Sequence, residues 1–150
     1  GSSLRGSEPY QFNTPHTIAT DAVGNVYVGD RGNARIQVFD NNLVLRAIYD
    51  NIGNPWEVCI SPGPHQYLYT SNSNPDSNPA ASWATSGEIY KMELDGTVIG
   101  KFGHAGKAVG EFQTVHGIDC RNPDELIIAE ISAWRVQKIL LRPQTTTSSR

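Results

Sequence analysis

Apolar residues recur along this chain in short alternating runs that are separated by turn-forming residues. The first group lies in residues 14–40, where a Gly-Asn turn and the segment Asp30-Arg31-Gly32-Asn33 divide three such runs. Strict alternation is typical of strands with one buried face, and β-branched residues such as Val26 and Val28 favour strands. No helical period competes with this pattern, so we expect three short β-strands here.

The same layout recurs twice more. The spacing from His16 to Asp30 equals the spacing from His116 to Glu130, and Trp56 holds the equivalent place in the middle copy. Repeats of about 40 residues with four strands each are typical of β-propeller blades. We therefore expect an all-β fold, a β-propeller with three four-stranded blades per chain, the last one lacking its fourth strand. Its parts are a lead-in or swapped edge strand (1–11), three blades (about 12–50, 54–102 and 112–142) and a frayed tail (143–150).

Three blades are too few to close a propeller, since known propellers have about four to eight. An open half would leave two apolar flanks and an unpaired edge. Either two chains close into a six-bladed homodimer about a two-fold axis, or the chain is a fragment of a longer protein. An N-terminal segment, its own or its partner's, would supply the missing fourth strand of the last blade.

Composition narrows the range of partners. The net charge of −3 provides no basic surface, which argues against a nucleic-acid partner, RNA included. No apolar run approaches the roughly 20 residues of a membrane span, so no membrane partner is expected. Cys59 and Cys120 lie in apolar strand contexts, and we expect two buried free thiols rather than a disulfide. Cysteine usage therefore leaves the compartment open.

Several motifs resemble NHL repeats. They are the lead Gly110-Glu111-Phe112 before His116, the core over residues 25–39 and the ending over residues 134–138. The resemblance spans roughly residues 10–142 and includes uncharacterised bacterial NHL-repeat proteins. It implies a secreted or periplasmic protein, although the printed chain opens without a signal peptide.

A narrower resemblance is to the C-terminal half of peptidyl-α-hydroxyglycine α-amidating lyases, which are six-bladed NHL propellers. In that family three histidines, each in a Pro-His-like element that opens a blade, hold a zinc ion. Pro15-His16-Thr17 and Val115-His116-Gly117 match this element, and Arg31 matches an arginine that binds substrate. The resemblance thus implies that His16 and His116 are metal ligands. The blades that would carry the third histidine, the catalytic tyrosine and a second arginine are absent from this sequence.

The residues themselves suggest a site at one end of the channel. His16, Trp56 and His116 open the innermost strands, so they should face the channel mouth. Four imidazoles in a dimer could hold a divalent metal such as zinc or calcium; alternatively, the histidines are hydrogen-bonded channel residues. Arg31 either binds a carboxylate or forms a salt bridge with Asp30 or Glu130.

Further candidates complete the prediction. Arg31 and Glu130 are candidate catalytic residues, Glu130 as a base or as a partner of a metal ligand. Arg31, Trp56 and Trp83 are candidate ligand contacts, and Trp83 in the insertion 72–86 is either a packing anchor or a contact. Glu57 should pack outward because its side-chain parity is opposite to that of Trp56.

Two functions compete. The first is a scaffold that binds a small molecule, a peptide or another protein through the mouth and the insertion. The alternative is a metal-dependent lyase or hydrolase acting on a small carboxylate-bearing substrate, with His16 and His116 as ligands. Whether the protein is an enzyme stays open at this point.

Overall fold

A computed structural model describes residues 4–73 and 86–141. The described chain forms β-strands and one short 3-10 helix, and it divides into three blades. Blade one contains β1 (Pro15–Thr20), β2 (Val26–Asp30), the helix η1 (Arg31–Asn33), β3 (Arg35–Phe39) and β4 (Leu45–Tyr49). Blade two contains β5 (Pro55–Ile60), β6 (Tyr67–Asn72), β7 (Glu88–Glu93) and β8 (Val98–Phe102). Blade three contains β9 (Val115–Asp119), β10 (Glu125–Glu130) and β11 (Arg135–Leu140).

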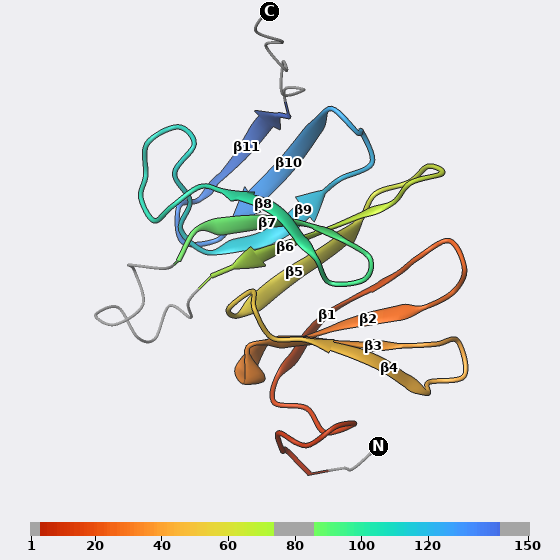
Figure 1. Cartoon of the computed structure of the whole chain (residues 1–150). Helices are drawn as coiled ribbons and strands as arrows, with labels where there is room; N and C mark the ends of the chain where they lie inside the picture. The colour runs from red at the N-terminus through yellow and green to blue at the C-terminus, as the bar shows by residue number, and fades with distance from the viewer. Residues whose placement is uncertain (1–3, 74–85, 142–150) are drawn as a thin grey trace, which may run out of the picture.

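Each blade is an antiparallel meander in which every strand pairs with the next one along the chain. Blades one and two have four strands and blade three has three. The blades are fanned side by side, with blade two between the others (Figure 1). The all-β architecture with three blade-like sheets is confirmed, and the described residues of blade three form three strands.

Apolar side chains join each blade to the next. Between blades one and two, Tyr27 and Ile36 pack with Leu68 and Met92 in one buried cluster. A second buried cluster joins blade two to blade three. Its members come from both blades and from the connector before β9: Tyr69, Ile89, Phe112, Val115, Ile118, Cys120, Leu126 and Ile128. Because burial of apolar surface is the main driving force of folding, these two clusters fix how the blades sit together.

A buried ion pair fastens the segment that precedes each of the outer blades. In blade one, Arg35 Nε donates to Asp30 at 2.8 Å, and its guanidinium also donates to the backbone oxygens of Ser7, Glu8 and Gln11. Blade three repeats this arrangement with Arg135 and Glu130, 2.7 Å apart, and with the backbone of the connector 103–112. The spacing that recurs in the two outer blades, from Asp30 to Arg35 and from Glu130 to Arg135, therefore serves a structural purpose.

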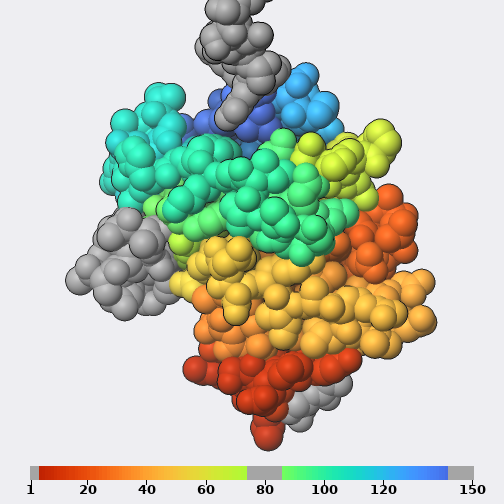
Figure 2. Space-filling model, in the orientation of Figure 1, coloured from red at the N-terminus to blue at the C-terminus, as the bar shows by residue number. Residues whose placement is uncertain are grey.

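Residues 4–12 form a hook on blade one rather than an edge strand of blade three. The Tyr10 amide donates to the Gln37 side chain at 3.1 Å, and the Tyr10 ring packs on Phe39. Figure 2 shows this segment (red) lying against blade one (orange to yellow). Its backbone is already engaged there, so residues 4–12 are not available to complete blade three of their own chain.

The expectation of two free thiols is wrong. Cys59 of β5 and Cys120, which directly follows β9, form a disulfide with a Cα–Cα distance of 6.1 Å. The inner strands β5 and β9 pack side by side, which brings the two cysteines together although 61 positions separate them in the sequence. Cys59 is half-buried in β5 and Cys120 is buried directly after β9, but the sequence does not show which strands become neighbours.

No helix in residues 4–73 or 86–141 is long and apolar enough to cross a lipid bilayer.

Candidate functional site

A β-bulge at the start of each inner strand positions the predicted mouth residues. In β1, Pro15 pairs with Asp30 and Thr17 with Gly29, so His16 is an extra residue. In β9, His116 is extra in the same way, between the pairs Val115–Glu130 and Gly117–Ala129. In β5 the bulge falls at Trp56 and Glu57. Since bulges redirect side chains, the three inner strands turn these residues toward one another.

His16, Trp56 and His116 form one aromatic cluster at the mouth. The ring centroids of His16 lie 4.9 Å from those of both Trp56 and His116, and the two imidazoles meet edge to face at 81°. Trp56 and His116 are 5.8 Å apart. One residue from each blade thus contributes, which confirms the prediction that these three residues lie together.

Arg31, the first residue of η1, lies over this cluster with its guanidinium carbon 4.1 Å from the centroid of the Trp56 ring. The alternative salt bridge to Asp30 or Glu130 does not form, because those carboxylates are bound by Arg35 and Arg135. Arg31 forms no ion pair with any residue in the described part of the chain. Its charge is therefore held in place by stacking while its donors remain available.

The environment of His16 favours a neutral imidazole. Burial lowers the pKa of His16, and the nearby charges of Arg31 and His116 lower it further. A contact of 2.6 Å joins His16 Nδ1 to the backbone oxygen of Trp56. In the neutral tautomer that satisfies this contact, Nδ1 donates its proton to the carbonyl, and Nε2 is left as an acceptor.

The Glu57 carboxylate reaches the neighbouring inner strand β1 instead of packing outward, so that expectation is wrong. Its carboxylate accepts a hydrogen bond from Thr17 Oγ1 of the neighbouring inner strand at 3.1 Å. Burial raises the pKa of Glu57, while hydrogen bonds and the charge of His116 act in the opposite direction. Sequence parity failed here because the bulge in β5 breaks the strict alternation of side chains.

Glu130 serves blade three rather than the mouth. It is 4% exposed and accepts hydrogen bonds from Arg135, Gln137 and the Gln113 amide. Because these donors occupy its carboxylate, Glu130 serves to anchor the connector 103–112 to blade three. Trp83 lies outside the described residues.

The metal prediction is limited by the number of available ligands. Within residues 4–73 and 86–141, no group of three or more histidine, cysteine, aspartate or glutamate side chains could hold a metal ion. His16 and His116 offer two adjacent imidazoles, so any further ligand would have to come from elsewhere. These two imidazoles would make up only part of the coordination sphere of a divalent metal.

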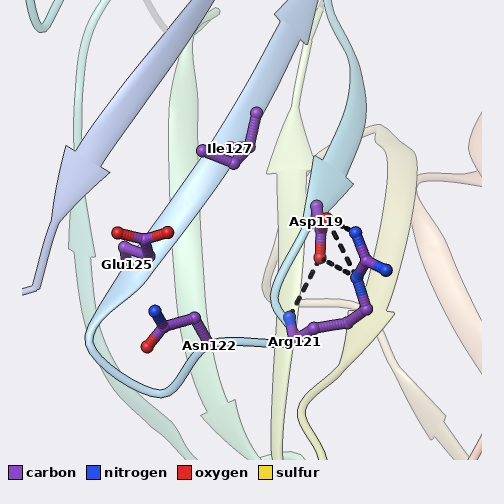
Figure 3. Close-up of a pocket in the computed structure, with 5 residues that line it drawn as sticks. All are labelled: Asp119, Arg121, Asn122, Glu125 and Ile127. Atoms are coloured by element: carbon purple, nitrogen blue, oxygen red, sulfur yellow. Dashed lines mark hydrogen bonds and ion pairs between the residues drawn. The ribbon is translucent and has the colours of Figure 1, made fainter.

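A separate hollow lies at the opposite end of blade three, between the end of β9 and the start of β10 (Figure 3). Asp119, Arg121, Asn122 and Glu125 line it together with Ile127. Arg121 donates to both oxygens of Asp119 and holds the pKa of that carboxyl at about 2, and Lys138 pairs with Glu125. Its charges are thus already neutralised in pairs, which sets it apart from the mouth.

The fanned antiparallel blades define an all-β, propeller-like protein, and the inner-strand cluster is its distinctive feature. Residues 12–39, which contain His16 and Arg31, match the NHL repeat. The chain is also similar to NHL repeat-containing protein 3 of Mus musculus (57% identical over 37 residues) and of Homo sapiens (54% over 37 residues). Each match covers 25% of this chain and 11% of the relative, so only a small part of those proteins is represented. The resemblance to the lyase stays a prediction from the sequence.

Proposed function

We propose that this protein is an interaction scaffold whose channel mouth binds an anionic group, such as the carboxylate of a small molecule or peptide. One observation carries the proposal: Arg31 is stacked on Trp56, without a carboxylate partner in the described residues, beside His16 and His116. NHL repeats typically form such scaffolds, and fold alone does not imply catalysis.

The chemistry of the cluster supports an anion rather than a cation. A guanidinium offers donors in a fork that matches a carboxylate, and charge-assisted hydrogen bonds of this kind are the stronger ones. His116 can add a donor, whereas the Nδ1 proton of His16 is already used on the Trp56 carbonyl, and the indole provides an apolar wall for the rest of the ligand. Glu57 is the nearby counter-charge; its carboxylate already accepts a hydrogen bond from Thr17 Oγ1, and burial raises its pKa.

Calorimetry with two matched probes tests the proposal. The probes are an N-acetylated tripeptide with a free C-terminal carboxylate and the same tripeptide ending in an amide. We expect the carboxylate form alone to bind, and Arg31→Gln to abolish that binding. Arg46→Gln, a change at an exposed arginine paired with Asp40, is the matched control and should bind like the original protein. Equal affinity for both probes, or no effect of Arg31→Gln, would refute the proposal.

A second candidate function, a metal-dependent lyase or hydrolase, is favoured by the 4.9 Å separation of the His16 and His116 rings. In such an enzyme His16 and His116 would hold the ion, which would activate a bound water, and Arg31 would orient the substrate carboxylate. Zinc titration of the protein and of His116→Gln decides between the two. Zinc binding that requires His116 supports this candidate, and an absence of binding removes it.

We further propose that three more blades, in the simplest case those of a second copy, close the propeller. Ile118 is 8% exposed against blade two, whereas its equivalent Ile18 on the outer flank of blade one is 67% exposed. On the opposite side of the fan, Ile36 is fully buried against blade two, whereas its equivalent Val136 is 66% exposed. Both open flanks thus carry residues that are buried wherever another blade is present. Light scattering should report a dimer, and a stable monomer would contradict this closure.

A further inference from the structure

The indole N–H of Trp56 is a buried hydrogen-bond donor without an acceptor. Trp56 is 5% exposed, and its Nε1 is one of two buried side-chain polar atoms that lack a hydrogen-bond partner among the described residues. The other, Gln113 Oε1, belongs to the segment that leads into β9. A buried tryptophan N–H usually finds a partner, because an unpaired donor costs free energy. The orphaned donor of Trp56 therefore needs a physical explanation.

Acceptors in the same cluster are used by other donors. His16 Nδ1 contacts the backbone oxygen of Trp56 rather than its indole, and the Glu57 carboxylate accepts from the neighbouring inner strand. Within the described residues, the aromatic and cationic contacts of the indole are with the rings of His16 and His116 and with the guanidinium of Arg31. The orphaned donor thus belongs to the group of residues that forms the proposed anion site.

The indole forms the floor of this cluster. Arg31 and His16 are half-buried and His116 is exposed, whereas Trp56 is almost completely buried. A ligand that pairs with Arg31 therefore meets the rim first and the indole last. Side chains at the rim can rotate without any change in the strands that carry them, so the floor can be reached by a small group of the ligand.

The position of Arg31 determines how far apart two ligand groups must be. Its guanidinium carbon lies 4.1 Å from the centroid of the Trp56 ring, over the face of the indole. The indole N–H points outward in the plane of its ring, so its acceptor lies near that plane. A carboxylate bound by Arg31 and an acceptor bound by Trp56 are thus separated by about the stacking distance. The two oxygens of one carboxylate are too close together to serve both.

Charge decides the nature of the second group. Arg31 is a single cation without an ion pair in the described part of the chain, and one carboxylate neutralises it. A second anionic group would be buried against the indole without a counter-charge, which is unfavourable. A carbonyl oxygen is neutral and brings no proton of its own that needs an acceptor. The second group is therefore best supplied by a carbonyl.

We propose that the mouth binds the acylated C-terminal residue of a peptide, in which a carboxylate and a carbonyl oxygen lie a few bonds apart. Arg31 receives the carboxylate, and Trp56 Nε1 donates its proton in a hydrogen bond to the carbonyl oxygen of the last peptide bond. Trp56 thereby distinguishes acylated chain ends from simple carboxylates. This inference rests on the proposed anion site and adds the class of ligand to it.

Four small carboxylates of similar size test the spacing. N-acetylglycine and levulinate carry the carbonyl where a peptide has it, valerate lacks the carbonyl, and α-ketovalerate, an isomer of levulinate, carries it next to the carboxylate. We expect the first two to bind about tenfold more tightly than the last two, because only they give the buried donor an acceptor. NMR titrations at one pH provide the four dissociation constants.

The indole N–H signal of Trp56 reports the hydrogen bond without any substitution in the protein. The signal is assigned in isotope-labelled protein through its contacts with the His16 ring. Levulinate should move it downfield, and valerate should move it far less. This measurement does not depend on whether a variant folds.

Trp56→Phe removes the N–H and keeps an aromatic ring. Levulinate should then lose its advantage over valerate. The ratio of the two affinities is measured within one variant, so a general weakening of the Arg31 stacking cancels. Trp134→Phe, the same change at a residue that is 92% exposed, is the matched control and should keep the preference.

Three results would overturn the inference. Equal binding of levulinate and valerate, abolished in both cases by Arg31→Gln, would refute the role of Trp56 and leave the anion site standing. Binding of none of the four carboxylates would refute both proposals. An indole signal that levulinate leaves unchanged and that shows contact with a long-lived water would assign the donor to a buried water instead of a ligand.

Discussion

Replacement of both Cys59 and Cys120 with alanine should remove the covalent link between blades two and three and lower the free energy of unfolding. The disulfide closes a loop with a sequence separation of 61 residues. In the chain-entropy description, closing a loop of this length lowers the conformational entropy of the unfolded chain and so raises its free energy by about 4 kcal/mol. Because domains are stable by only about 5–15 kcal/mol, this loss is a large part of the total.

The lost free energy of unfolding should not be enough to unfold the protein, and the reason is structural. Ile89, Phe112 and Leu126 remain buried in the cluster that joins the same two blades, and alanine removes only small side chains from it. We therefore expect about 2–4 kcal/mol, the usual range for a native disulfide.

Urea unfolding followed by tryptophan fluorescence measures the change, with the midpoint and the slope fitted separately. A reducing agent provides the control: it should shift the midpoint of the original protein and leave that of the double variant unchanged. A loss below about 0.5 kcal/mol would refute the reasoning, since effects of that size are usual for substitutions that touch no important contact. Two free thiols in the denatured, unreduced protein would refute the disulfide itself. An intact bridge would also indicate folding in an oxidising compartment.

Three other predictions follow from buried or shifted charges. Arg35→Ala leaves the fully buried Asp30 carboxylate without its ion pair, which should cost about 3–5 kcal/mol in urea unfolding and expose the amides of residues 6–12 to hydrogen exchange; an unchanged midpoint would contradict it. The pKa of His16 should lie below its ordinary 6.5 in an NMR titration, so His16 lowers stability as the pH falls below 6.5; a pKa above that value would contradict the burial argument. Because burial raises the pKa of Glu57, its contribution to stability decreases as the pH rises above 4.5, and Glu57→Gln should stabilise the protein at neutral pH but not in acid. Equal effects of this substitution at both pH values would show that its charge is unimportant.

Strand order, blade number and the mouth residues could be predicted from local pattern and repeat spacing. Period-two alternation identifies strands, and equal spacing places His16 and His116 at equivalent positions whatever the details of packing. The equivalent position of Trp56 in the middle blade could be predicted from the same repeat register. All three therefore meet in the structure as expected.

The sequence-based expectations that were wrong concern features that depend on backbone irregularity and on contacts between blades. The bulge in β5 turns Glu57 inward, and neither parity nor composition signals it. The Cys59–Cys120 bridge depends on which inner strands become neighbours. The equal spacing from Asp30 to Arg35 and from Glu130 to Arg135 was visible, but its use as an anchor for the preceding segment needs the coordinates of that segment.

The central claim is that the mouth cluster receives an anionic group through Arg31. NMR of the Arg31 guanidinium and of the His16 and His116 imidazoles, during titration with the tripeptide carboxylate, tests it most directly. We predict saturable shifts of all three side chains with the carboxylate and none with the amide. Unchanged Arg31 signals at saturating carboxylate would contradict the claim.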